Sequence, residues 1–259
     1  NNQNYAGAWL AAILPICFFK LKKHFHVKYK RIIFLSLLII FFTGILLTTS
    51  RNAIIATLLS IPIMLGASIK IWFICTTFII FLLISIFIFD LPLEILRPLR
   101  KSKLLESFIP DYDLKFSDIL SFNRIKIWKS SISFILQRPI FGWGASSFSV
   151  LFMLHNKDFL ILHTHNLLLE VSHNYGVIVA IILFTSIFQL MRKTNKKLFP
   201  SKSSLIKEFE YPDIDKYWWT SSFLMLFMHL SDITYYDGRI SILLWLLLSG
   251  LVMNLREAR

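Results

Sequence analysis

Residues 163–184 read HTHNLLLEVSHNYGVIVAIILF, and they mark the point where a histidine-containing polar segment enters an apolar run. No Asp, Glu, Lys or Arg occurs from Val171 to Met191, a stretch long enough to cross a bilayer. His165 and Asn166 precede this run, and Gly176 follows them after nine intervening residues. A histidine at the water end of a membrane span can take or give a proton near neutral pH. We therefore interpret His165 as a candidate general base at a membrane surface.

The composition of the whole chain is that of a membrane protein. Of its 259 residues, 56% are hydrophobic and 25 are phenylalanine. Its apolar runs are too long and uncharged for a soluble domain, and too continuous for a transmembrane β-barrel. The sequence therefore predicts an all-α polytopic membrane protein. The chain begins without Met and without a signal-peptide pattern, so we expect the C-terminal portion of a longer protein.

Seven transmembrane helices are expected in this chain. They cover approximately residues 5–19, 32–49, 52–69, 71–89, 167–191, 217–231 and 240–255. The predicted organisation is four transmembrane helices in residues 1–89, a periplasmic loop with amphipathic helices in residues 90–166, and three transmembrane helices with a cytoplasmic loop in residues 167–259. Together these parts are expected to form one domain.

Lysine and arginine predict the orientation of these spans. Three segments that share a high density of basic residues are 20–31, 192–216 and 256–259. Seven alternating spans place all three on one face, which is the cytoplasmic face by the positive-inside rule. Arg51, residues 90–166 and residues 232–239 are then periplasmic. The net charge of +13 is thus explained by topology and by contact with lipid headgroups, and no nucleic-acid motif accompanies it.

The long outer segment contains a predicted amphipathic helix at residues 122–137. Apolar side chains recur there at helical spacing, at Ile125, Trp128, Ile132 and Ile135. Arg138-Pro139 is expected to end the helix, and the glycines of residues 141–144 predict a tight turn. We expect this segment to lie along the membrane surface.

Two arginines share the predicted face with His165. Arg51 stands between two uncharged apolar runs, where it is either a helix-end residue that reaches water or an anion clamp. Arg124 lies on the amphipathic helix, where it belongs either to a solvated face or to the same anion site. A guanidinium can hold a phosphate with two parallel hydrogen bonds. For His165 the alternative is a hydrogen-bonded structural histidine.

Metal binding is not expected from the sequence. The histidines around Glu170 lack the spacing of a zinc protease, in which two histidines four residues apart flank a glutamate. Two Asp-x-Asp tripeptides, at residues 111–113 and 213–215, fall on opposite predicted faces and are interpreted as loop aspartates. No glycine-rich phosphate loop and no nucleophile elbow are found. We therefore expect neither a metal nor a cofactor.

Several motifs occur together and in order. They are TTSRNA at residues 48–53, FNRIKIWKSSISFILQRPIFGWG at residues 122–144 and HTHNLLLEVSHNYGVI at residues 163–178. This combination resembles the O-antigen ligase family of bacterial inner-membrane proteins. That family includes ligases, some polysaccharide polymerases and proteins once described as bicarbonate transporters. The Asn-rich start, NNQNYAGAWLAAILP at residues 1–15, is also similar to the family.

The resemblance implies a glycosyltransferase in the inner membrane, with its active site facing the periplasm. Arg51 and Arg124 would bind the diphosphate of a polyprenyl-linked glycan, and His165 would be the base for the acceptor hydroxyl. Asn166 and Gly176 would support the site. The acceptor would be lipid A-core or another glycan. The implied reaction is metal-independent and inverts the anomeric centre.

Three alternatives stay open from the sequence. A polymerase uses the same donor and differs in its acceptor. A transporter of bicarbonate or another anion is favoured by His229 and Asp232 at the end of the predicted sixth span. The second to fourth spans, and the fifth from Val171 onward, lack the charges that ion pathways need. A non-catalytic scaffold would leave the placement of Arg51 and His165 unexplained.

Overall fold

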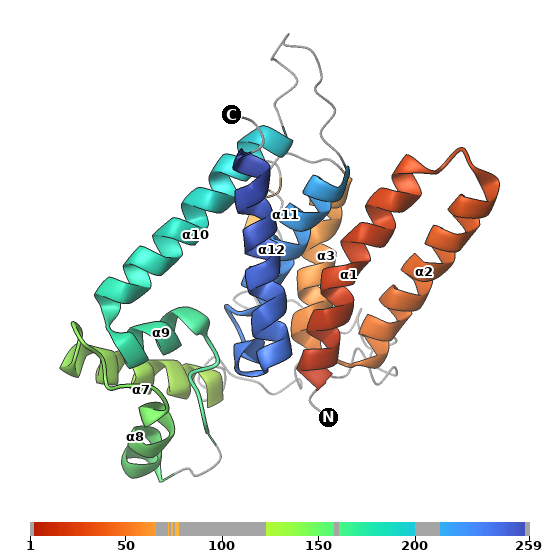
Figure 1. Cartoon of the computed structure of the whole chain (residues 1–259). Helices are drawn as coiled ribbons and strands as arrows, with labels where there is room; N and C mark the ends of the chain where they lie inside the picture. The colour runs from red at the N-terminus through yellow and green to blue at the C-terminus, as the bar shows by residue number, and fades with distance from the viewer. Residues whose placement is uncertain are drawn as a thin grey trace.

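The computed structural model describes residues 3–65, 72, 74, 76, 77, 123–157, 161–199 and 213–256. Every regular element in these ranges is helical, which confirms the predicted all-α fold (Figure 1). The elements are α1 (Gln3–Lys23), α2 (Lys28–Leu47), α3 (Arg51–Met64), α7 (Asn123–Gln137), α8 (Ser147–Asn156), α9 (Leu167–Tyr175), α10 (Val177–Leu198), α11 (Asp213–Met228), the 3-10 helix η3 (Thr234–Tyr236) and α12 (Gly238–Arg256).

Four of the described helices, α1, α2, α10 and α12, are long and apolar enough to cross a membrane. They correspond to the predicted first, second, fifth and seventh spans. Helix α3 is a shorter apolar helix of 14 residues within the predicted third span, and α11 has 16 residues in the place of the sixth. Most of the predicted fourth span, residues 71–89, lies outside the described residues.

The predicted fifth span, residues 167–191, is wrong as one continuous helix, because Gly176 divides it into α9 and α10. Gly176 has φ +89°, a conformation that L-residues rarely adopt. A Cβ built at this position would lie 1.9 Å from the carbonyl oxygen of Ile140. The next amide, Val177 N–H, donates to the Pro139 carbonyl at 2.7 Å. The helix therefore breaks where the turn after α7 approaches the backbone.

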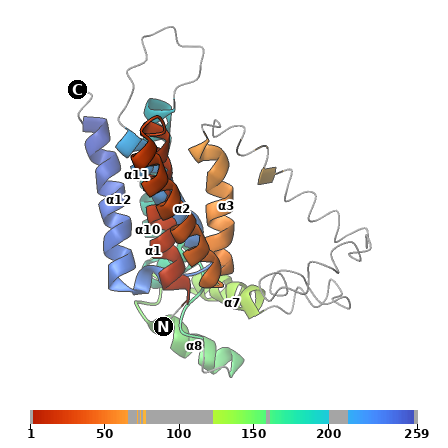
Figure 2. The ribbon, with the colours of Figure 1, turned by 90° about the vertical axis from the view of Figure 1, so that its right-hand side faces the viewer.

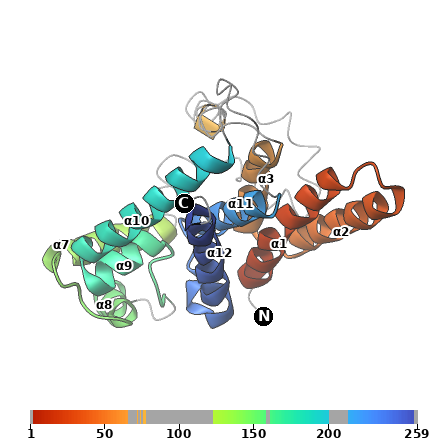
Figure 3. The ribbon, with the colours of Figure 1, turned by 45° about the horizontal axis from the view of Figure 1, so that its top comes forward.

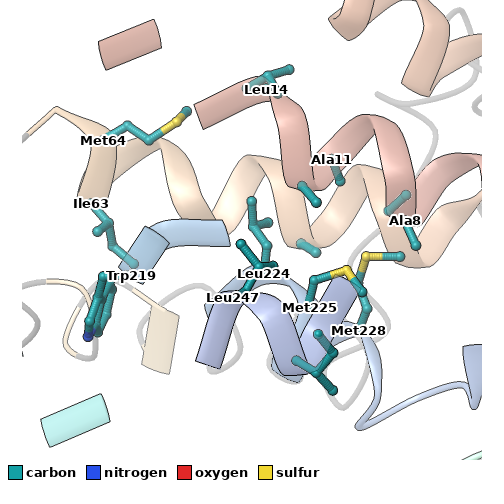
Figure 4. Packing of buried hydrophobic residues seen from close by; sticks show 14 of the residues in the cluster. Ala8, Ala11, Leu14, Ile63, Met64, Trp219, Leu224, Met225, Met228 and Leu247 are labelled. Atoms are coloured by element: carbon teal, nitrogen blue, oxygen red, sulfur yellow. The ribbon is translucent and has the colours of Figure 1, made fainter. Parts of the chain in front are cut away.

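Helix α11 is the centre of the bundle and packs against α1, α3, α10 and α12, as the view in Figure 3 shows for its neighbours. Figure 4 shows how its buried side chains meet those of α1, α3 and α12. The residues labelled there are Ala8, Ala11, Leu14, Ile63, Met64, Trp219, Leu224, Met225, Met228 and Leu247. Small residues let helices approach closely, and such packing stabilises helix bundles in lipid. A Cβ on Gly7 would lie only 2.7 Å from the Cβ of Ala53 on α3.

Helix α2 lies at the outside of the bundle, antiparallel to α1 (Figures 1 and 2). Ile45 is the buried residue of this helix, and most of its other apolar side chains are half-buried or exposed. An all-round apolar surface of this kind is suited to contact with lipid.

A second, smaller core lies between α7 and α8 at one end of the bundle, where α9 packs against both helices (Figure 1). Its buried members are Ile127, Phe134, Phe148 and Phe152. The observed helix at 123–137 confirms the helix predicted for residues 122–137, and the predicted turn follows it with positive φ at Gly142 and Gly144. Helix α9 belongs to the predicted part 167–259 and packs against α7 and α8 of the predicted part 90–166, so these two parts are in contact. The predicted boundary at residue 89 lies outside the described residues.

The basic helix ends lie together at the opposite end of the bundle (Figure 1). The basic residues in the last turns are Lys20, Lys22 and Lys23 of α1, Lys196 and Lys197 of α10, and Arg256 of α12. This arrangement agrees with the alternation predicted from the sequence. Which end faces the cytoplasm stays a prediction.

Candidate active site

Three loops meet the start of α1 at the end of the bundle that carries α7, α8 and α9. They are residues 48–50 before α3, residues 161–166 before α9, and residues 229–237 between α11 and α12. Hydrogen bonds between side chains connect all three loops. Residues far apart in the sequence are thereby brought to one place.

The central contact joins His165 to Asp232. The Nδ1 atom of His165 lies 2.9 Å from Oδ1 of Asp232, and the two side chains are 26% and 7% exposed. Asn4 donates from Nδ2 to the other carboxylate oxygen at 2.5 Å, and the backbone N–H of Ile233 donates to Oδ1 at 2.9 Å. Since an ionised carboxylate only accepts hydrogen bonds, the proton of a neutral His165 ring belongs on Nδ1. The Nε2 atom is then left as an acceptor.

The surroundings keep the Asp232 carboxyl ionised. Burial alone would raise the pKa of Asp232, but the hydrogen bond and the charge of His165 outweigh it and lower that pKa below its ordinary value. The backbone N–H of Ile233 and the charge of Arg124 act in the same direction. The negative charge of Asp232 is therefore present throughout the neutral range.

The backbone of His165 is held in an unusual conformation, with φ +53°. Thr49, which precedes the start of α3, has φ +54°. Left-handed conformations of residues other than glycine are uncommon, and they persist where neighbouring contacts impose them, frequently at functional sites. His165 belongs to the pair with Asp232, and Thr49 directly precedes Ser50, which bonds to Asn4. The two conformations support a functional interpretation of this end of the bundle.

Asn166 fixes the segment that carries His165 in two directions. Its Oδ1 accepts the Leu169 N–H at 3.1 Å, so that Asn166 caps the start of α9. Its Nδ2 donates to the Leu230 carbonyl at 2.8 Å, in the loop that also carries Asp232. The Leu167 N–H donates to the His229 carbonyl at 2.9 Å in the same loop. The cap residue therefore sets the distance between His165 and Asp232.

Glu170 is a second buried carboxylate close to this segment. It accepts hydrogen bonds from the backbone N–H of Thr164 at 3.0 Å, from Nδ2 of Asn174 at 3.2 Å and from the hydroxyl of Tyr236. Burial and the bond to Glu170 raise the pKa of the Tyr236 hydroxyl, so that it stays protonated and keeps donating. Glu170 thus connects the residue before His165 to the loop after Asp232.

Arg51 is the first residue of α3, and its side chain is exposed. The preceding Ser50 caps the helix and donates from Oγ to Oδ1 of Asn4 at 2.7 Å. The following Asn52 donates to the Met228 carbonyl at 2.8 Å and accepts from Ser231 Oγ at 2.9 Å. The residues on both sides of Arg51 are therefore tied to the network around Asp232.

Arg124 is the second residue of α7, and its side chain is exposed. Its charge lowers the pKa of Asp232 and also that of His163, after the larger effects of burial and of His165. The guanidinium therefore lies within Coulomb range of the loops that carry both groups. Unlike the direct contact between His165 and Asp232, this relationship is one of charge alone.

His163 is a close neighbour of His165. The two ring centroids are 4.2 Å apart in an edge-to-face arrangement, and the ring of Tyr236 is 5.9 Å from that of His163. One ligand atom each from His163, His165 and Asp232 lie within 4.8 Å of one another. Spacing along the chain did not predict this group, because Asp232 is 67 positions away from His165.

Sequence reasoning missed two roles in this network. Asp232 was noted only as a feature in favour of transport, although the predicted topology already placed residues 232–239 on the face of His165. Asn4 bridges Ser50 and Asp232. It lies in the Asn-rich start of the chain, and this composition was the one sequence feature that pointed to the segment.

Residues 35–184, more than half of the chain, match the profile described as O-Antigen ligase. The chain belongs to the O-antigen ligase family. No curated protein matches the chain. The matched range contains Arg51, Arg124, His165, Asn166 and Gly176. O-antigen ligase family members are glycan-transferring enzymes, and the apolar helices of this one make it a membrane protein.

Proposed function

We propose that this protein transfers a glycan from a polyprenyl-diphosphate carrier to a hydroxyl group of a periplasmic acceptor such as lipid A-core. The observation that carries the proposal is the His165–Asp232 pair at one end of an apolar helical bundle, tied through Asn4 to the start of α3. The family assignment supports glycan transfer in general.

His165 is assigned the role of general base. Asp232 accepts the Nδ1 proton and orients the ring, so that Nε2 takes the proton of the acceptor hydroxyl. As that proton leaves, the acceptor oxygen forms a bond to the anomeric carbon of the donor glycan. The bond from this carbon to the phosphate oxygen breaks, and its electron pair leaves with the diphosphate. A single displacement of this kind inverts the anomeric centre.

Arg51 and Arg124 are assigned to the diphosphate. Each stands in the first turn of a helix, and neither first turn contains an acidic residue. Helix N-termini favour anions, and a guanidinium adds charge with two-point geometry. These groups would stabilise the negative charge that grows on the departing diphosphate. Because a lipid diphosphate is already an activated leaving group, this mechanism uses no cofactor and no metal.

The same arrangement supports an assignment of the two membrane faces. The end with α7, α8 and α9 is assigned to the periplasm, since the basic helix ends lie at the opposite end. Single cysteines at Lys126 on α7 and Lys196 on α10 provide the test, because both positions are exposed. In intact spheroplasts, an impermeant thiol reagent is expected to label the first and not the second. Labelling of Lys196→Cys alone would show that the orientation is the opposite of the one assigned.

Reconstituted transfer tests the reaction itself. The full-length protein in proteoliposomes is supplied with a lipid-diphosphate glycan and lipid A-core, with EDTA present. His165→Ala is expected to lower transfer by about 10²-fold or more. The matched control is His26→Ala, an exposed histidine at the opposite end of the bundle. Normal transfer by His165→Ala would remove the proposed mechanism.

The choice of acceptor separates ligase from polymerase. Transfer to lipid A-core supports a ligase, whereas elongation of a lipid-linked repeat unit with no use of lipid A-core supports a polymerase. Bicarbonate uptake that depends on the protein, without transfer to any acceptor, would favour the anion transporter.

A further inference from the structure

Three side chains that can bind a metal ion lie together at the end of the bundle that carries α7, α8 and α9. They are His163, His165 and Asp232, and one ligand atom from each lies within 4.8 Å of the others. We propose that they form a binding site for a divalent transition-metal ion such as Zn²⁺, and that the bound ion inhibits the enzyme. The inhibitory part rests on the proposed function, because it assumes that His165 is the base. The binding part does not depend on that assumption.

The donor set determines which ion fits. Two imidazole nitrogens and one carboxylate oxygen form a three-ligand set of the type that binds Zn²⁺ and leaves a fourth position open. Imidazole suits Zn²⁺, Cu²⁺ and Ni²⁺, whereas Mg²⁺ and Ca²⁺ prefer oxygen ligands. Magnesium, which is abundant in cells, is therefore not expected to occupy this site.

The surroundings allow a metal ion to enter and be held. His163 and His165 are half-buried, so they are reachable from water, while Asp232 is buried behind them. The second oxygen of Asp232 is oriented by Asn4, an outer contact of the kind that supports metal ligands. The nearby positive charge of Arg124 opposes a cation. We therefore expect binding that is weaker than in a structural zinc site and reversible by a chelator.

Inhibition follows from the chemistry of one imidazole ring. If Nε2 of His165 binds the ion, the lone pair that accepts the acceptor proton is occupied. If Nδ1 binds it instead, the neutral ring must carry its proton on Nε2, and that atom no longer accepts. In the first case the ion occupies the lone pair of Nε2, and in the second it replaces the Nδ1–H bond to Asp232. His165 can act as a base in neither case. A metal in this site therefore blocks the reaction rather than assisting it.

Binding is tested first, without any activity assay. ZnCl₂ is titrated into the purified full-length protein in competition with a chromophoric chelator, and a single ion per chain is expected to bind. His163→Gln, which keeps a hydrogen-bond acceptor beside the His165 backbone N–H, should weaken binding by roughly tenfold or more. His26→Ala is the matched control for surface histidines and should leave the affinity unchanged. Equal affinity in the wild type and His163→Gln would overturn the site.

The rate of transfer is then measured with and without Zn²⁺ for each protein, and the ratio of the two rates is compared between the wild type and His163→Gln. The wild type should be inhibited in proportion to occupancy and recover with EDTA, while His163→Gln should resist the same concentration. Zn²⁺ binding through His163 in a protein without transfer activity would contradict the proposed function and leave the site intact. Transfer by the wild type that is unaffected by saturating Zn²⁺ would overturn the inhibitory role and leave the proposed function intact.

Discussion

His165 and Asp232 are 67 positions apart in the sequence, and their side chains share a contact of 2.9 Å between Nδ1 and a carboxylate oxygen. The contact decides which ring nitrogen carries the proton, and therefore which nitrogen is available to an acceptor hydroxyl. The catalytic assignment of His165 thus depends on a residue in a different loop.

Asp232→Asn tests this dependence. An amide can donate from its NH₂ group to Nδ1, which would move the ring proton to Nε2 and remove the base. Transfer is expected to fall by about 10²- to 10⁴-fold, as when the carboxylate of a Ser-His-Asp triad is replaced by an amide. Initial rates in proteoliposomes measure the loss, and the melting temperature checks that the variant is folded.

The control for Asp232→Asn is Asp237→Asn, in the same loop. Asp237 pairs with Arg239 at 2.7 Å, and the guanidinium of this pair is exposed to water. Exposed ion pairs contribute little to stability, so both transfer and melting should stay near the wild type. Equal losses in the two aspartate variants would show that the loop, and not the contact with His165, is responsible.

The sequence predicted those features that depend on local pattern. The helix at 123–137 follows from apolar spacing, and α3 begins at Arg51, one residue before the start of the predicted third span at residue 52. The break at Gly176 was missed because no charged residue occurs from Val171 to Met191, while the cause is the approach of the Ile140 carbonyl from another segment. The pairing of Asp232 with His165 likewise depends on helix packing, which spacing along the chain does not report.

Arg51→Lys tests the diphosphate site. A lysine keeps the charge but cannot make two parallel hydrogen bonds to phosphate oxygens. Loss of one charge-assisted bond predicts a fall of about tenfold or more in kcat/KM for the lipid-diphosphate donor. Arg124→Lys should act in the same direction, and Arg239→Lys, in the exposed pair with Asp237, is the matched control. Full activity of Arg51→Lys would argue against a two-point clamp.

Glu170→Ala tests the buried carboxylate behind the site. The change leaves the Thr164 N–H and the Asn174 amide without their acceptor, and a buried unsatisfied group costs about 1–3 kcal/mol. A lower melting temperature is expected, together with slower transfer, since Thr164 adjoins His165. Tyr236→Phe removes only one of the donors and should be milder. An unchanged melting temperature in Glu170→Ala would contradict the role given to this residue.

Gly176→Ala tests the junction between α9 and α10. The added Cβ would collide with the Ile140 carbonyl at 1.9 Å and would occupy a residue with φ +89°. Strained backbone of this kind costs on the order of 1–3 kcal/mol, and the collision adds to it. Thermal melting should show a clear loss. Gly238→Ala, where no heavy atom lies within 4 Å of an added Cβ, should melt like the wild type.

The pH dependence of transfer tests which group at the site gains a proton on acidification. The pKa of Asp232 is lowered because the hydrogen bond and charge of His165 outweigh burial, so the stabilisation from its charge is present above the ordinary carboxyl pKa. That stabilisation is lost only as pH falls through the lowered value of the folded protein. Burial lowers the pKa of His163, and the charge of His165 lowers it further, so His163 is neutral where a free imidazole is half protonated. Both pKa values are therefore shifted away from pH 7.

A loss of transfer on acidification within about pH 5 to 8 is therefore assigned to protonation of the base, because an imidazolium has no lone pair to accept the hydroxyl proton. His165→Ala should remove this acid limb from the residual transfer, because the group that accepts the proton is gone. His163→Gln should keep the limb. The measurement is kcat/KM against pH with EDTA present, so that metal binding does not contribute. The same acid limb in the wild type and in the residual transfer of His165→Ala would contradict the assignment of His165 as the base.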